Sequence, residues 1–402
     1  MKEKQAITKE VAKRYRKAKK KEKTKMLDEL VATTEYNRSY ATRALRLALK
    51  TELKGRCGPK RRRRRDRIYN DIVLRALKKV WATLDMPCGK RLAPYLETIV
   101  PVLERFDELD LKGDTGDKLV SMSAATIDRL MKAERRRIDL KRRSGTKPGS
   151  LLKHQIPIRT FADWDENRPG FLEIDLVAHN GGNPRGDFCQ TLDATDIHST
   201  WTETRAVKNK AQVWAFEALM DISKDLPFDI RGIDSDNGSE FINEHLVKYC
   251  RENKITFTRS RPLRKNDNCF IEQKNYTVVR KTVGYARHDT DEELAVLNEL
   301  YISLRRYTNF FQPTMKLTQK IRIGSKIKKT YDRPKTPYQR LMDCPQIGKA
   351  AKAKLKAEYE SINPAAVKRT LTALVDELFK VNVNKNKSIR KEETPLTLSS
   401  TF

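Results

Sequence analysis

The sequence predicts a multidomain protein with an α-helical, helix-turn-helix N-terminal region, an α/β core built on a mixed five-stranded sheet flanked by helices, and a small basic β plus helical C-terminal region. Three observations predict this organisation. Apolar residues recur at helical spacing over the first 148 residues, strand-like apolar runs begin near residue 171, and a formal net charge of +31 is concentrated near the N-terminus. At about 100–200 residues per domain, the chain accommodates two to four domains.

The excess of basic residues indicates a polyanionic partner. Residues 1–67 carry 25 basic and 8 acidic side chains, and residues 129–147 carry nine basic and two acidic ones. A merely soluble surface mixes both signs, whereas clustered positive charge is typical of nucleic-acid binding. We therefore expect a nucleic acid as the main partner.

Membrane and zinc-binding classes are not indicated. No apolar run reaches the roughly 20 residues that span a bilayer, and no hydrophobic stretch follows the basic N-terminus as it would in a secretory signal. The six cysteines are scattered, without the spacing of zinc ligands. We expect a cytoplasmic protein with no membrane partner and no structural zinc.

Residues 1–54 are predicted to form a helix-turn-helix DNA-binding domain. Apolar residues in Lys25–Val31 have helical spacing, a break follows at 33–37, and a basic helix runs from Arg38 to about Ala48. The second helix of such a pair enters the DNA major groove. Its outward cations, the candidate DNA contacts, are Arg38, Arg43 and Arg46.

Residues 55–67 form a basic linker, followed at 68–148 by a second helical region and a further linker. The first linker has no apolar residues to bury, and its five consecutive arginines predict an arm along phosphates. These arginines are Arg61, Arg62, Arg63, Arg64 and Arg65. Helices are expected near Ile68–Leu84, Leu92–Phe106 and Ala124–Ala133, with a polar loop at Asp107–Lys118 and Ser123 as an N-cap. This region is either a second helix-turn-helix unit, with Arg129 on DNA, or a plain helical bundle.

Residues 160–300 change to an alternation of strands and helices. Strands are expected at Phe171–Val177, Asp187–Asp193, Thr200–Val207, Phe228–Ile233 and Ile255–Thr258, and helices at Ala211–Ser223, Ser239–Glu252 and Phe270–Tyr285. Three strands followed by alternating helices and strands have the order of the ribonuclease H fold.

Residues 301–381 are predicted to form a basic C-terminal region. It contains a helical segment at Leu304–Phe310, a small basic β hairpin or barrel at Lys316–Tyr331, and further helix at Lys349–Lys380. Residues 382–402 are polar, and we expect a disordered tail there.

Three carboxylates are placed so that the fold would bring them together. Asp175 lies within an apolar strand, Asp236 follows the fourth strand, and Glu272 lies near the start of the last core helix. In the ribonuclease H fold these three places meet, and converging carboxylates hold paired divalent cations about 3.5–4 Å apart. Each alone also has an ordinary explanation, as a strand-edge residue, a turn residue and a helix-start acid. Their joint occurrence predicts a metal site.

Other polar residues of the core remain open as alternatives. Glu173 shares the strand face of Asp175, and Asp234 competes with Asp236. Asp193 and Asp196 are interpreted as turn residues near strand ends. His179 and His198 are interpreted as surface or capping histidines that could lie near the site.

The spacing and flanks of the three carboxylates resemble the D,D(35)E signature of retroviral integrases and insertion-sequence transposases. Asp236 and Glu272 are separated by 35 residues, and Asp175 and Asp236 by 60. Asp-Asn-Gly-Ser-Glu-Phe from 236, the asparagine-containing segment 266–275 around the glutamate, and Tyr-Thr-Asn through proline at 307–313 resemble the family's elements. The resemblance covers residues 160–315. The retroviral His₂Cys₂ zinc module is lacking, so the chain is most similar to bacterial insertion-sequence enzymes.

The resemblance implies a DDE-type DNA transposase, nucleoid-associated in a prokaryote. Such an enzyme hydrolyses transposon ends and transfers their 3′-OH ends into target DNA. Asp175, Asp236 and Glu272 would hold two Mg²⁺ ions, with Mn²⁺ as a substitute, and a homo-oligomer would act on double-stranded DNA. Further DNA contacts are expected at Arg259, Arg261, Lys265, Lys274 and Arg280.

Two other functions share parts of this pattern. A non-catalytic, sequence-specific DNA-binding protein derived from a transposase would explain the charge but does not need the three carboxylates. A ribonuclease H or resolvase nuclease shares the core but generally lacks the long basic flanks and the 35-residue spacing. A DNA-binding protein would function equally well after replacement of Glu272. A nuclease would cut DNA without joining it, and a transposase would join DNA 3′ ends to a target.

Overall fold

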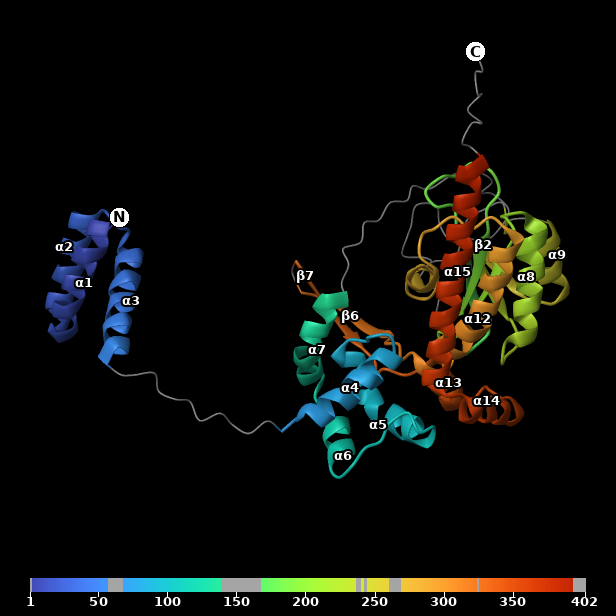
Figure 1. The fold of residues 1–402 in the computed structure, drawn as a ribbon, viewed down its shortest axis with the longest axis horizontal. Helices are drawn as coiled ribbons and strands as arrows, with labels where there is room; N and C mark the ends of the chain where they lie inside the picture. The colour runs from blue at the N-terminus through green and yellow to red at the C-terminus, as the bar shows by residue number, and fades with distance from the viewer. Residues whose placement is uncertain are drawn as a thin grey trace, which may run out of the picture. The chain divides into compact units, whose positions relative to one another are not determined.

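Two compact units make up the described part of the chain. The computed structural model describes residues 2–56, 68–138, 168–235, 240–241, 244–259, 269–323 and 325–392. One unit lies within residues 1–68 and the other within residues 69–402 (Figure 1). No helix in these ranges is long and apolar enough to cross a membrane.

The first unit consists of three helices, α1 (Lys2–Lys17), α2 (Lys20–Thr34) and α3 (Arg38–Arg56). They pack on a small core that includes Leu30 and Leu45. Helix α2 ends at Glu35, whose φ of 58° is left-handed and whose N–H donates to the Val31 carbonyl at 2.8 Å. The predicted break and the start of the basic helix are thus confirmed, and that helix continues beyond the expected Ala48. Its docking into DNA remains a prediction.

The second unit opens with four helices. These are α4 (Asp71–Thr83), α5 (Gly89–Arg105), α6 (Thr115–Val120) and α7 (Ala124–Ile138). The Ser123 hydroxyl accepts from the Thr126 N–H at 3.3 Å, as expected of the N-cap. Helix α6 overlaps the predicted loop at Asp107–Lys118; it is too short to show helical periodicity in sequence and is anchored by the buried Leu119.

A mixed five-stranded sheet forms the centre of this unit, as predicted. Its strands are β1 (Phe171–Ala178), β2 (Gln190–Asp196), β3 (Thr202–Val207), β4 (Gly232–Ser235) and β5 (Thr256–Arg259). Their order is β3-β2-β1-β4-β5, with β1, β2 and β3 antiparallel and β1, β4 and β5 parallel. Strand β2 begins three residues later than predicted, since the chain remains irregular until Gln190.

Helices cover both faces of the sheet (Figure 1). Helices α8 (Gln212–Asp225) and α9 (Glu244–Glu252) pack on the face that contains Leu172 and Ile174. The other face is covered by α10 (Cys269–Lys274), the π-helix η2 (Asn275–Arg280), α11 (Lys281–Val283), α12 (Asp291–Phe311) and α15 (Pro364–Glu392). Because strand side chains alternate between faces, Glu173 and Asp175 point to the α10 side.

The C-terminal region contains the predicted basic hairpin and more helix than expected. The hairpin is β6 (Leu317–Ile323) with β7 (Lys326–Tyr331), followed by α13 (Pro337–Asp343) and α14 (Lys349–Ser361). Helix α15 runs to Glu392, so the disordered tail predicted from residue 382 is wrong for residues 382–392. Asn382 and Lys385 lie in this helix and hydrogen-bond to the Arg287 carbonyl and to Glu293. Residues 393–402 lie outside the described residues.

Residues 69–138 and the C-terminal helices share one hydrophobic core. Buried residues of α4, α5 and α7 pack with Trp201 of the sheet region, Phe310 of α12 and Leu341 of α13. These segments are therefore parts of one compact unit.

Two asparagines of α12 satisfy the free edge of β3. The Asn309 side chain accepts from the Thr202 N–H at 2.9 Å and donates to the Thr202 carbonyl at 2.8 Å. Asn298 makes the same pair of bonds with Ala206, at 3.0 and 3.1 Å. An exposed strand edge is prone to unwanted pairing, so these amides complete the sheet at an edge that no described strand pairs with.

Replacing Asn309 should destabilise the second unit. In Asn309→Ala, the buried N–H and carbonyl of Thr202 lose both partners, which costs about 1–3 kcal/mol of unfolding free energy. Chemical denaturation should show this loss, with a smaller one for the less buried Asn298→Ala. The exposed Glu299→Ala on the same helix is the control, and an Asn309→Ala as stable as this control would contradict the role assigned to the amide.

Candidate active site

Asp175 lies in the middle of β1, half-buried, and is held from the helix side. Its Oδ2 accepts a hydrogen bond from Asn275 Nδ2 at 2.6 Å, and its Oδ1 accepts from the Leu176 N–H at 2.8 Å. Asn275 is the first residue of η2. The carboxylate is thus oriented by a side chain 100 residues further along the chain.

Glu272 lies on α10, one helical turn before Asn275, and its side chain is exposed. The preceding residue, Ile271, is fully buried and donates its N–H to Glu173 Oε2 at 2.6 Å. Glu173 therefore satisfies a backbone donor at the start of α10 that has no partner within the helix. Its position in the sequence made Glu173 an alternative to Asp175 as a metal ligand. In the structure, its hydrogen bond to Ile271 attaches α10 to β1.

Asp236 lies outside the described residues. The chain is described up to Ser235, which ends β4 and is paired in register with Ile174, the residue before Asp175. Asp234, the competitor of Asp236, is buried and accepts a hydrogen bond from Thr258 on β5. Strand β4 thus ends at the level of Asp175, and Asp234 faces a neighbouring strand.

The donors that the described residues supply at this place are oxygens. Asp175 and Glu272 come from segments in direct contact, and the Asn275 amide lies beside Asp175. Such a set suits a hard cation such as Mg²⁺, which keeps several waters and needs few protein ligands. Among the residues that the structure describes, no group of three or more His, Cys, Asp or Glu side chains is arranged to hold a metal ion.

Asp193 is an inner carboxylate of the site, and its interpretation as a turn residue is wrong. It lies in the middle of β2, directly across from Asp175 in the antiparallel register, and is fully buried. Burial raises the pKa of Asp193, and the neighbouring Asp175 charge acts in the same direction. Asp196, in contrast, ends β2 and accepts from the N–H groups of Gly170 and Ser199, as a turn residue does.

Lys274 is the buried counterpart of Asp193. Its Nζ donates to the Thr200 carbonyl at 3.1 Å, and only 8% of the residue is exposed. Burial lowers the pKa of Lys274, and the Asp193 carboxylate opposes that change. Its position in the sequence predicts a DNA contact, but its burial favours a role inside the protein. Nothing about its position in the sequence, two residues after Glu272, predicts that it is buried near Asp193.

The helix that carries Glu272 changes its winding at the contact with Asp175. It is α-helical to Lys274 and a π-helix from Asn275 to Arg280. Short π-helical turns occur frequently at functional sites, because the wider turn shifts the side chains that follow. Here the change begins at Asn275, the residue that holds Asp175.

The candidate DNA contacts fall into three groups. Arg38, Arg43 and Arg46 on α3 and Arg129 on α7 are exposed. Arg259 is 4% exposed, and Arg280 donates to the Ala178 carbonyl at 2.7 Å, so both are engaged inside the protein. The others, which lie outside the described residues, are Arg61, Arg62, Arg63, Arg64, Arg65, Arg261 and Lys265.

The two core histidines have structural partners. His179 is fully buried and its Nε2 lies 2.7 Å from the Thr191 hydroxyl, which in turn contacts the Tyr301 hydroxyl. Burial lowers the pKa of His179 to about 3, so the ring is neutral. This ring is therefore not placed as a catalytic base. The backbone carbonyl of His198 accepts from Lys316 at 2.9 Å, and the interpretation of His198 as a surface or capping histidine stays a prediction.

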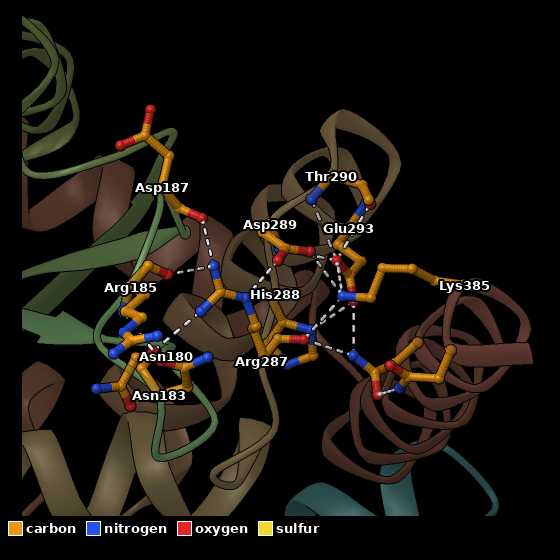
Figure 2. Close-up of polar contacts among 12 residues, drawn as sticks. Asn180, Asn183, Arg185, Asp187, Arg287, His288, Asp289, Thr290, Glu293 and Lys385 are labelled. Carbon is orange, nitrogen blue, oxygen red and sulfur yellow. Dashed lines mark hydrogen bonds and ion pairs between the residues drawn. The ribbon is translucent and has the colours of Figure 1, made fainter. Parts of the chain in front are cut away.

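Arg287 holds the loop that follows β1 beyond Asp175 (Figure 2). Its guanidinium donates to the carbonyls of Asn183, Arg185 and Asp187 at 2.9–3.0 Å. The loop approaches closely here, because a Cβ on Gly181 would lie 2.7 Å from the Cβ of Arg287.

A second group of contacts attaches this support to α15. His288 Nδ1 lies 3.0 Å from Glu293, and Lys385 donates to both Glu293 and Asp289 (Figure 2). These bonds lower the pKa of the Glu293 carboxyl despite its burial. The loop that follows β1 is therefore braced by the C-terminal helix.

Comparisons with known proteins give one clear relative. No protein-family profile matches the chain. It is 40% identical over 332 residues to uncharacterized protein y4rM of Sinorhizobium fredii, covering 82% of this chain and 92% of that protein.

Solved structures with some similarity are retroviral catalytic cores. The integrase catalytic core domain of HTLV-2 in complex with magnesium, in its dimeric form, is 12% identical over 36% of this chain and 90% of that chain, with a TM-score of 0.28. The catalytic core domain of BIV integrase is 13% identical over 43% and 94%, also with a TM-score of 0.28. These scores are low, and the fold assignment rests on the strand order of this chain.

Removing Lys274 should destabilise the protein. Lys274→Met removes the cation that opposes the raised pKa of Asp193, so Asp193 should stay protonated at neutral pH, and the lost bond to the Thr200 carbonyl should cost about 1–3 kcal/mol of unfolding free energy. The double variant Asp193→Asn/Lys274→Met should recover part of this loss in chemical denaturation. Exposed Lys224→Met serves as the control. If the two single changes simply add in the double variant, the pair does not interact.

Arg287→Lys should loosen the loop after β1. A lysine cannot donate to three carbonyls in the fixed geometry of a guanidinium, so amides at 181–187 should exchange hydrogen about tenfold faster, equivalent to about 1.4 kcal/mol. Hydrogen-exchange mass spectrometry measures this directly, with Arg306→Lys on α12 as the matched control. Unchanged exchange would show that other contacts hold the loop.

Proposed function

This chain belongs to the same family as uncharacterized protein y4rM of Sinorhizobium fredii, and we propose that it is a DDE-type DNA transposase. In this proposal the enzyme hydrolyses DNA at transposon ends and transfers the resulting 3′-OH ends into target DNA. The proposal rests on the site geometry of this chain.

One observation carries the proposal: β1 is joined at two points, on either side of Glu272, to the continuous helix formed by α10 and η2. Ile271 donates to Glu173, and Asn275 donates to Asp175. Strand β4 ends in register beside the same part of β1. These are the three segments in which the sequence places the spaced carboxylates, although they are separated by 60 and 35 residues.

The buried carboxylates around Asp175 support a cation at this place. Asp193 lies across from Asp175, and Asp234 lies across from Glu173, on three adjacent strands. Like charges placed opposite each other are destabilising, and burial increases the cost. Lys274 supplies positive charge on the β2 side. A divalent cation beside Asp175 would relieve the remaining repulsion.

In the proposed mechanism, Asp175, Asp236 and Glu272 hold two Mg²⁺ ions, or Mn²⁺ in their place. When bound, these ions would activate the attacking hydroxyl and stabilise charge on the leaving oxygen. Asn275 keeps the Asp175 carboxylate in one orientation, and the Glu173 bond keeps α10 at a fixed height above β1. Glu272, which is exposed, is accessible to a phosphodiester from solvent.

The exposed cations give the proposed partner. Arg38, Arg43 and Arg46 lie on one solvent-facing side of α3, where a major groove would contact them. Arg129 on α7 is a further phosphate contact in this proposal. The DNA substrates are transposon ends and target, and two ends brought together require more than one copy of the chain.

The decisive experiment is a strand-transfer assay with purified protein, Mg²⁺ or Mn²⁺, and DNA ends that flank its gene. Asp175→Asn, Asp236→Asn and Glu272→Gln should each reduce joining by about 10³-fold or more, because metal stabilisation is worth several kcal/mol. All three should still bind DNA in EDTA. Exposed Glu217→Gln on α8 should join ends like the wild type.

Three outcomes would overturn the proposal or its residues. A wild type that binds DNA but neither cuts nor joins with either metal is a non-catalytic DNA-binding protein. Cutting without joining indicates a nuclease. Variants that join as well as the wild type would show that the chemistry lies elsewhere.

A further inference from the structure

The β6–β7 hairpin is a two-stranded ribbon with an unusual surface (Figure 1). Residues 316–331 contain six lysines and arginines and no acidic residue. The strands pair only with each other, and their contacts with other described elements are few. An isolated two-stranded hairpin is marginally stable in water, so the ribbon gains from a partner.

Cations and apolar side chains share both faces of the ribbon. Arg322 is paired with Ile327 on one face, and Ile321 with Lys328 on the other. Ile321 is 40% exposed and Ile327 47% exposed. A solvated edge is usually protected by charge alone, and these exposed isoleucines indicate that a partner covers the ribbon.

Three exposed cations of the ribbon are without an acidic partner among the described residues. Arg322, Lys328 and Lys329 form no ion pair with a carboxylate in the described part of the chain, and all three are exposed. Positive charges along one ribbon repel each other. A partner that carries regularly spaced negative charge would remove this repulsion.

A cavity at the base of the ribbon has the same sign of charge. Its volume is about 970 Å³, and Lys329 and Tyr331 of β7 form part of its wall. Its cationic lining consists of Arg91, Lys274, Lys281, Lys316, Lys329 and Lys368. Of the described residues in the wall, Asp85 alone is a carboxylate, and it pairs with Lys281 and Lys368. The positive surface therefore continues from the ribbon into the body of the protein.

We propose that β6–β7 inserts into the major groove of duplex DNA as a recognition ribbon. The inference rests on the proposed function for the identity of the polyanion. A two-stranded ribbon fits the major groove, where apolar side chains contact thymine methyl groups and cations reach guanine edges or the flanking phosphates. Arg322 and Ile327 lie opposite each other on one face of the ribbon, as such contacts require.

The chemistry of the ribbon favours duplex over single-stranded DNA. Proteins that bind single strands present aromatic rings on which successive bases stack. The ribbon has one aromatic residue, Tyr331, and it lies at the base, beside the cavity. Aliphatic side chains between cations suit base edges in a groove.

Duplex binding measured in EDTA tests the ribbon without any chemistry. In the triple variant Arg322→Ala/Lys328→Ala/Lys329→Ala, binding should depend less on salt. The negative slope of log K (the association constant) against log salt concentration should become shallower by about 2–3, because each lost phosphate contact contributes about 0.9. The matched control Lys349→Ala/Lys354→Ala/Lys356→Ala removes equal charge from exposed positions on α14. Its slope should change by less than 1.

Groove insertion has its own measurement. Wild type should protect guanine N7 atoms in the major groove of the bound duplex from methylation. Ile327→Ser, on the face that carries Arg322, should lose part of that protection, and Ile321→Ser on the other face should keep it. Thermal melting confirms that each variant is folded, since all the changed side chains are exposed. Equal loss of affinity for single and double strands, with N7 protection unchanged, would overturn groove insertion.

The outcomes separate this inference from the proposed activity. Binding and protection that depend on the ribbon, together with no strand transfer under either metal, would retain the ribbon and refute the transposase. Strand transfer with a ribbon variant that binds DNA like the wild type would retain the enzyme and refute the ribbon.

Discussion

The attachment of α10 to β1 is the constraint on which the rest of the site depends. Glu173 accepts the Ile271 N–H, and Asp175 accepts from the Asn275 amide, so two successive carboxylates on one strand face hold one turn of helix. Glu272 lies between these contacts and remains exposed. Because the strand and the helix are bound through backbone and side chain together, neither can slide without breaking both bonds. This junction positions a solvent-facing carboxylate near one that is half-buried.

Charge inside the sheet follows from that arrangement. The α10 face of β1, β2 and β4 carries Glu173, Asp193 and Asp234 in the interior, where unpaired charge is costly. Glu173 accepts a hydrogen bond from a helix N–H, Asp193 lies near a buried lysine, and Asp234 accepts a hydrogen bond from a threonine hydroxyl. The apolar core is placed on the opposite face under α8 and α9. Because side chains alternate between the two faces of the sheet, one face carries the apolar core and the other carries the carboxylates.

The surrounding helices make this polar face rigid. Helix α12 completes the β3 edge through two asparagines, and α15 braces the loop after β1 through Glu293 and Arg287. The α4–α7 helices join α12 and α13 in one core. A site that must hold repelling groups close together needs such support, since the sheet alone would not resist their separation.

The sequence by itself determined the succession of strands and helices along the chain, the helix break before Arg38 and the segments that carry Asp175 and Glu272, because apolar periodicity and motif spacing are local properties. The role of Asp236 stays a prediction from the same spacing. Only the tertiary structure decided that Asp193 faces Asp175, that Lys274 is buried beside it and that Asn275 orients the strand carboxylate. It also decided that the polar residues after 382 continue a helix. These features depend on contacts between segments that are far apart in the sequence. The residues next to each position in the sequence do not determine which distant segment it will contact.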